Sequence, residues 1–275
     1  MVIQHNIAAN NAYRNLSSNA SNGQKNLEKL SSGYRINRSA DDAAGLAISE
    51  QMRSKINGLD QATANANDAI GLIQTAEGAL TETHSMLQRM VTLATQSANG
   101  TYNTTARSAI SAEVQALKDE IDRIASTTDY NGVKPLASSA EIQVQIGPTS
   151  GEILKIAASA MNTSALGVSS ITVSSVSSAN AAITKINEAV DKVSSHRAKL
   201  GASQNRLEHT INNLKTTNEN MTAAESRIRD TDMAKEMAAF TKNNILNQAA
   251  PVSYTHLDVY KRQVLYAISP ILSYP

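Results

Sequence analysis

Histidine is the residue type in this chain with the most scope for metal binding or acid–base chemistry near neutral pH, because cysteine is absent. The five histidines are His5, His84, His196, His209 and His256. They do not form the His-Glu-x-x-His spacing of zinc hydrolases. The 12 glycines make no phosphate-binding loop, and no serine lies in a Gly-x-Ser-x-Gly turn. We therefore expect no catalytic residue, no metal site and no cofactor.

Three residues with polarisable or titratable side chains are better explained as packing residues. His84 falls on the same seven-residue repeat as Ile70 and Val91, where a packed imidazole is far more common than a metal ligand. Met86 and Met90 follow in the same stretch and fit a helix interface.

The composition excludes further classes of protein. A formal charge of +1 gives no broad basic surface for nucleic acid, and no apolar run approaches the roughly 20 residues that cross a bilayer. The first residues lack the basic and apolar regions of a cleavable secretory signal, so we expect any export to use another route. Aromatic residues make up 3% of the chain, which favours close contacts between helices over a bulky globular core.

The elements that carry these residues are predicted to be long helices. Between residues 183 and 228 the apolar residues recur in alternating steps of three and four, a heptad repeat typical of coiled coils. The apolar members of this seam are Ile186, Val190, Val193, Leu200, Leu207, Ile211 and Leu214. Polar residues enter it at Arg197, Gln204, Asn218 and Glu225 and would help to fix its register.

Two more helices show matching seams. A helix over 42–98 carries Leu59, Ile73, Leu80 and Leu87, and a helix over 104–126 carries Ile110, Val114, Leu117 and Ile121. Asp41 is the expected N-cap of the first, and Asn99-Gly100 should end it, because both residue types tolerate left-handed backbone. The fold class predicted is mainly α: a long antiparallel bundle or coiled coil.

The remaining segments lack the heptad pattern of the three long helices. Residues 142–146 and 153–156, joined by a Gly-Pro turn, predict a small β-hairpin, and the Ser-rich stretch 164–180 predicts a short irregular connection. The first forty residues and residues 231–250 are only intermittently apolar. Such helices are marginal alone, so we expect them to become ordered on assembly.

Several long motifs resemble bacterial flagellins. At the N-terminal end these are residues 30–37 (LSSGYRIN) and 41–48 (DDAAGLAI). At the C-terminal end they are residues 197–202 (RAKLGA), 205–207 (NRL) and 224–232 (AESRIRDTD). The shorter matches are 87–90 (LQRM), 121–124 (IDRI) and 161–167 (MNTSALG). The resemblance covers nearly all of residues 1–250.

The resemblance implies a structural subunit of the flagellar filament and the following organisation. Residues 1–41 and 230–250 would form an inner layer, and residues 42–178 and 179–229 a surrounding rod, without the variable outer domains of longer flagellins. Implied partners are further copies in a helical polymer, the flagellar cap, junction proteins and an export chaperone. Export would use the flagellar type III apparatus, giving an extracellular location. A hook–filament junction protein and a monomeric coiled-coil binding module stay open as alternatives.

The resemblance also implies a receptor contact. In some flagellins a patch on the rod is bound by the animal toll-like receptor that senses flagella, and the matching residues here are Arg89, Leu93 and Glu113. The alternative role of Arg89 and Glu113 is an ordinary polar contact within or between rods, and that of Leu93 is packing.

The last residues depart from the family pattern. Residues 251–275 contain four of the eight tyrosines and three of the five prolines, which do not continue an amphipathic helix. Val252 to Leu257 can be encoded by DNA resembling the transposon end used in library preparation. We therefore expect 251–275 to be a foreign tail that replaces part of the C-terminal inner-layer helix.

Overall fold

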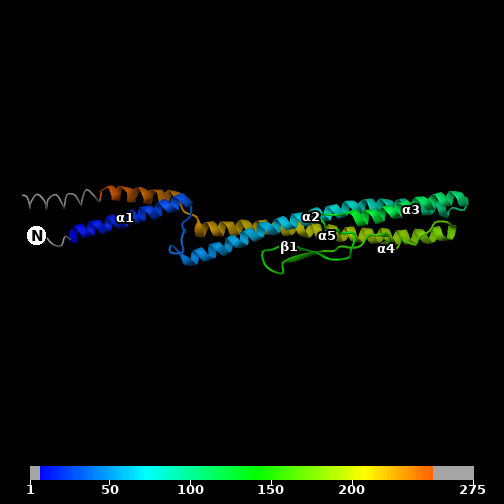
Figure 1. Ribbon diagram of the computed structural model, residues 1–275, viewed down its shortest axis with the longest axis horizontal. Helices are drawn as coiled ribbons and strands as arrows, with labels where there is room; N and C mark the ends of the chain where they lie inside the picture. The colour runs from blue at the N-terminus through cyan, green and yellow to red at the C-terminus, as the bar shows by residue number, and fades with distance from the viewer. Residues whose placement is uncertain (1–6, 250–275) are drawn as a thin grey trace, which may run out of the picture. The chain divides into compact units, whose positions relative to one another are not determined.

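The computed structural model describes residues 7–249, so His5, His256 and the expected foreign tail lie outside the described residues (Figure 1). The helices are α1 (Ile7–Ser32), α2 (Ala43–Ala98), α3 (Thr104–Thr127), α4 (Thr163–Leu166) and α5 (Val176–Arg229), and residues 233–249 are also helical. The strands are β1 (Ile142–Gln145) and β2 (Ile153–Ile156). The mainly α fold class with a small hairpin is confirmed.

The chain forms two compact units. One consists of Met1–Ser54 and Met221–Pro275, and the other of Lys55–Asn220. The divisions fall inside α2 and α5, whereas the sequence analysis placed them at 41/42 and 229/230, near the ends of these helices. Helical periodicity continues across both divisions, so it gives no sign of them.

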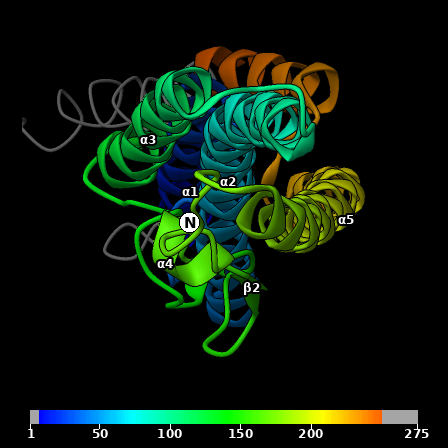
Figure 2. The same cartoon turned by 90° about the vertical axis from the view of Figure 1, so that its right-hand side faces the viewer.

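The Lys55–Asn220 unit contains the hydrophobic core. There α2, α3 and α5 run alongside one another, and the hairpin and α4 lie against them (Figures 1 and 2). Nearly all the heptad-seam residues are buried in this unit: Leu59, Ile73, Leu80, Leu87, Ile110, Val114, Ile121, Ile186, Val193, Leu200, Leu207, Ile211 and Leu214. Leu117 and Val190 are partly buried and pack on the same cluster.

Both ends of α2 are capped by groups other than those predicted from the sequence. Asp42, not Asp41, is the N-cap, since its Oδ1 accepts a hydrogen bond from Gly45 N at 2.9 Å. Asp41 instead accepts from the backbone N–H groups of Asn37 and Arg38, which lower the pKa of its carboxyl.

At its other end α2 stops at Ala98, as expected, but without left-handed backbone at Asn99 or Gly100. The Arg107 guanidinium of α3 satisfies the free carbonyls, donating from Nε to Ser97 O at 3.1 Å and from Nη2 to Asn99 O at 3.0 Å. The Arg107 side chain of α3 therefore caps the C-terminal end of α2, a role that the sequence predicted for left-handed backbone at Asn99-Gly100.

The prediction of an irregular connection over 164–180 holds for residues 167–175 but is wrong at both ends, where α4 and α5 extend into it. Thr163–Leu166 is a helical turn anchored to α3, because Asp122 accepts hydrogen bonds from Thr163 N and Oγ1, both at 2.8 Å. The buried Lys118 of α3 donates to Ser169 O at 3.1 Å, which holds the next few residues. α5 then begins at Val176, where Ser175 and Ser178 exchange side chain to backbone hydrogen bonds as a capping pair.

The hairpin is close to the predicted one. β1 and β2 pair antiparallel, with Ile142 opposite Ile156 and Gln145 opposite Ile153. Leu154 and Ile156 face the core, whereas Ile153 is exposed. Alternation therefore directs one face of β2 against the helices.

Candidate functional site

The two helices of the first unit expose their apolar residues. Among the described residues of α1 and 233–249, no hydrophobic side chain is buried. The large exposed side chains on the two helices are Ile7, Tyr13, Leu27, Met233, Met237, Ile245 and Leu246, each 39% to 72% accessible. Large apolar side chains exposed along both helices are typical of a surface that contacts another molecule.

These helices nevertheless pack on each other. They lie side by side in Figure 1, and a Cβ added to the buried Gly23 would stand 3.8 Å from the Asn247 amide nitrogen. With its amide oriented to satisfy its neighbours, Asn26 donates to Glu236 Oε1 at 2.9 Å and accepts from Asn243 Nδ2 at 3.0 Å. Gly23 and the side-chain amides therefore form the contact between the two helices, and their large apolar side chains stay exposed.

A polar junction ties the base of this pair to the start of α2. Gly33 and Tyr34 form a short antiparallel bridge with residues 229–231: Arg35 N donates to Arg229 O at 2.6 Å, and Thr231 N donates to Gly33 O at 3.0 Å. Gly33 has φ of 76°, a left-handed conformation that ends α1 and that glycine adopts without strain.

Arg229 is the central residue of this junction. Its guanidinium carbon lies 4.6 Å from the centre of the Tyr34 ring, and its Nη1 lies 2.5 Å from Glu50 Oε1. This hydrogen bond holds the pKa of the Glu50 carboxyl below its usual value. Helical spacing gives no sign of this contact, although Tyr34 and Arg229 both lie in motifs that carry the family resemblance.

The three receptor-patch residues do not share one surface. Arg89 of α2 and Glu113 of α3 form an ion pair, with Arg89 Nη2 2.8 Å from Glu113 Oε1, and their side chains are 54% and 44% accessible. Leu93, one turn along α2 from Arg89, is 1% accessible and belongs to the core. A partner could therefore reach the charged pair, but it could not reach Leu93 without rearrangement.

The three histidines within residues 7–249 make no contact with one another in the structure. His84 Nε2 lies 2.9 Å from the Gln88 side chain, His196 is buried, and His209 is exposed. Within residues 7–249 no three histidine or carboxylate side chains gather so as to hold a metal ion. In the same range no helix is both long and apolar enough to span a bilayer.

Comparison with known proteins gives two family matches. Residues 3–141 match the bacterial flagellin N-terminal helical region, and residues 183–266 match the bacterial flagellin C-terminal helical region. The second match includes part of residues 251–275, and the foreign origin of that segment stays a prediction.

Individual relatives agree with these matches. The flagellin of Halalkalibacterium halodurans is 50% identical over 268 residues, covering 96% of this chain and 98% of the relative. The flagellin of Bacillus subtilis is 47% identical over 300 residues, covering 96% and 99%. The crystal structure of Bacillus cereus flagellin is 35% identical with a TM-score of 0.51, covering 59% of this chain and 94% of that one.

Proposed function

Since this chain belongs to the bacterial flagellin family, we propose that α1 and residues 233–249 are the segments through which its copies polymerise. As a flagellin it is a structural subunit of the flagellar filament, outside the cell. The observation that carries the proposal is the exposed apolar surface of the two helices, within which no described hydrophobic side chain is buried.

In the single chain, α1 and residues 233–249 bury little apolar surface. Isolated helices with little buried apolar area are marginal in water, and covering a large aliphatic side chain contributes about 1.5–3 kcal/mol. Contacts with neighbouring copies would cover Leu27 and Ile245, which are 54% and 61% accessible in the single chain. Contacts between different surfaces of identical copies extend into an open helical filament when the rotation from one copy to the next does not close a ring.

Polymerisation assays test this assignment. We expect Leu27→Asp and Ile245→Asp each to raise the critical concentration for pelleting at least about tenfold, because each puts a charge into a buried contact. Ile153→Asp is the matched control, since Ile153 is 42% accessible but lies in β2. Circular dichroism checks that the helices persist. Normal filaments from both terminal-helix variants would contradict the proposal.

The assays are best run in two backgrounds. One is the 275-residue chain itself. In the other, residues 251–275 are replaced by the corresponding residues of the Bacillus subtilis relative. If 251–275 is foreign, the second background should polymerise at lower concentration, because its C-terminal helix is continued. Equal polymerisation would remove the case for a foreign tail.

Export and accessory partners form a second part of the proposal. We infer export by the flagellar type III apparatus without a cleaved signal, and contacts with an export chaperone, junction proteins and the cap. Weakly packed terminal helices unfold at low cost, which suits passage through a narrow channel. Their exposed apolar faces would also be bound by a chaperone before assembly. Secretion of the chain from cells with and without the flagellar export ATPase tests the route.

A contact with the flagellin-sensing toll-like receptor is the third part. The accessible Arg89–Glu113 pair supports a polar contact across α2 and α3, with Leu93 acting from beneath by holding that surface in shape.

A further inference from the structure

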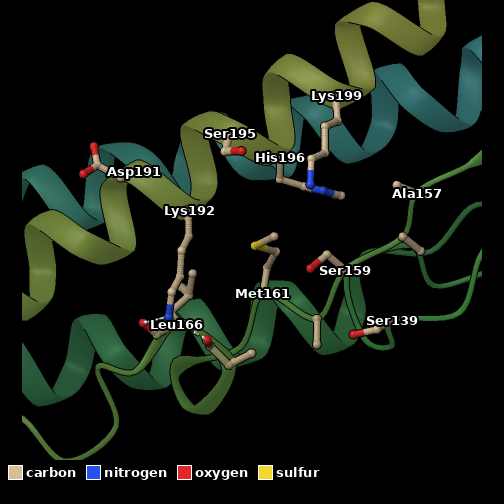
Figure 3. A pocket seen from close by; sticks show the side chains of 13 residues that line it. Ser139, Ala157, Ser159, Met161, Leu166, Asp191, Lys192, Ser195, His196 and Lys199 are labelled. Carbon is tan, nitrogen blue, oxygen red and sulfur yellow. Dashed lines mark hydrogen bonds between the residues drawn. The ribbon is translucent and has the colours of Figure 1, made fainter.

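The Lys55–Asn220 unit contains a cavity of about 560 Å³ between α5 and residues 157–166. Figure 3 shows α5 above it and the side chain of Met161 below. Met161 and Leu166 form an apolar floor together with several alanines, and Ser139, Ser159 and Ser195 contribute hydroxyl groups to the walls. The cavity thus combines apolar side chains with groups that can form hydrogen bonds.

His196 is a polar group in this cavity without a partner. Its side chain is 5% accessible, yet no residue in 7–249 forms a hydrogen bond or ion pair with it. Figure 3 shows the ring leaving α5 toward the segment that carries Ser159. The ring nitrogens are not among the solvent-inaccessible side-chain atoms that lack a partner within residues 7–249, so water reaches them in the cavity. A ligand that enters the cavity would replace this water as their hydrogen-bond partner.

The charges on the cavity walls favour an anion. Lys192 and Lys199 line it from α5, and Asp191 is the carboxylate in the lining. Figure 3 places Asp191 on the far side of Lys192 from His196. Lys192 is held in position, because its Nζ donates to Leu166 O at 3.1 Å and Ala165 O at 3.3 Å. An ammonium has three donors, so one remains for a ligand.

We propose that this cavity binds a carboxylate carried on a short apolar chain. The carboxylate would accept hydrogen bonds from the His196 ring and the Lys199 ammonium, and the apolar chain would lie on Met161 and Leu166. A cation is disfavoured by the two lysines, and a fully polar anion would leave the apolar floor uncovered. The same chemistry is offered by a free aliphatic carboxylate or by a glutamate side chain of a second copy.

Burial and the nearby Lys199 hold the pKa of His196 below its usual value, so the ring is neutral in the empty cavity at neutral pH. A bound carboxylate would raise that pKa, and by linkage its affinity should increase as the pH falls from 8 to 6.

Titration with hexanoate tests the proposal. In the monomeric chain with ¹⁵N-labelled histidine, we expect hexanoate to shift the His196 ring signals saturably, with Kd on the order of 1–10 mM as befits a small ligand. Ligand-detected NMR should show at least a fivefold loss of affinity in His196→Asn and in Lys199→Met. The matched controls are His209→Asn and Lys215→Met, exposed positions on the same helix, which should leave affinity unchanged.

Three results would overturn the proposal: no saturable shift at His196, equal shifts with hexylammonium or 1-hexanol, or equal losses in the control variants. Filaments identify the source of the carboxylate. If hexanoate binds to filaments as it does to monomers, the ligand is a free carboxylate. If polymerisation itself shifts His196 and blocks hexanoate, a glutamate of a second copy occupies the cavity.

Discussion

Gly58 of α2 lies against Pro148 in the turn between β1 and β2, so close that a Cβ added to Gly58 would stand 2.7 Å from Pro148 Cβ and 3.3 Å from Pro148 Cα. The second of these is a backbone atom, which cannot move aside as the end of a side chain can. The absence of a side chain at one helical position therefore allows the hairpin to pack on α2.

Gly58→Ala should destabilise the protein, although alanine is the better helix former. Replacing a helical glycine by alanine contributes about 0.5–1 kcal/mol, but forcing a hairpin away from its helix costs about 1–3 kcal/mol. Gly78→Ala is the matched control in α2, because nothing lies within 4 Å of its added Cβ, and it should stabilise. Urea unfolding of both variants measures the difference, and a stabilised Gly58→Ala would contradict the close packing.

Arg107→Met should destabilise the unit that contains α2 and α3 by about 1–2 kcal/mol, since it removes the side-chain donor to Ser97 O and leaves Asn99 O with only the long bond from Tyr102 N at 3.4 Å. Arg123→Met is the control. Within residues 7–249 the Arg123 guanidinium pairs with Glu120 alone, on the exposed surface of α3, so its loss should change stability by less than about 0.5 kcal/mol. Thermal unfolding compares the two. Equal effects would show that Arg107 does not cap α2.

Helix periodicity predicted most of this fold because burial follows it closely. A residue every three or four positions is buried when two helices pack along their length, so residues such as Leu80 and Ile186 could be placed from spacing alone. The hairpin was likewise predicted from a pattern, the alternation of apolar and polar residues at 142–146.

Contacts between distant segments could not be predicted in this way. Arg107 ends α2, Lys118 holds residues 169–171, and Arg229 contacts Tyr34 and Glu50, in each case through long side chains whose partners depend on tertiary packing. His196 is similar: the heptad seam predicted from the sequence includes Arg197 and not His196, and the cavity that His196 faces is completed by Ser139 and by residues between 157 and 166. Spacing reports which face of a helix is buried and says nothing of what lies opposite.

Stability should fall as the pH is lowered below about 6.5, through His196. The pKa of the ring is about 6.5 in the unfolded chain and is lowered in the fold by burial and by Lys199, so the unfolded chain binds the proton more tightly. The contribution is fully present above pH 6.5 and is lost as the pH falls toward the folded pKa. Lys192 and Asp191 also line the cavity from α5. The facing residues, Ser139 and residues 157–161, carry no charge.

Urea unfolding between pH 8 and 5.5 measures this dependence, in a range above the usual titration of carboxylates. We expect His196→Gln to flatten the slope, and His209→Asn, which alters an exposed ring on the same helix, to retain it. An unchanged slope in His196→Gln would show that other groups control the pH response.

Arg89→Ala and Leu93→Ala should affect receptor signalling by different routes. Arg89 is 54% accessible and paired with Glu113 at the surface, so its loss should change stability by less than about 1 kcal/mol and lower signalling directly. Leu93 is buried in the core, so its truncation should cost about 2–5 kcal/mol and lower signalling only as far as it unfolds the rod. Reporter cells with the toll-like receptor, combined with thermal unfolding of each variant, separate the two effects. Because Glu113→Gln removes the charge of the partner with little change in shape, it should resemble Arg89→Ala in both measurements. Full signalling by both Arg89→Ala and Glu113→Gln would exclude this pair from the receptor contact.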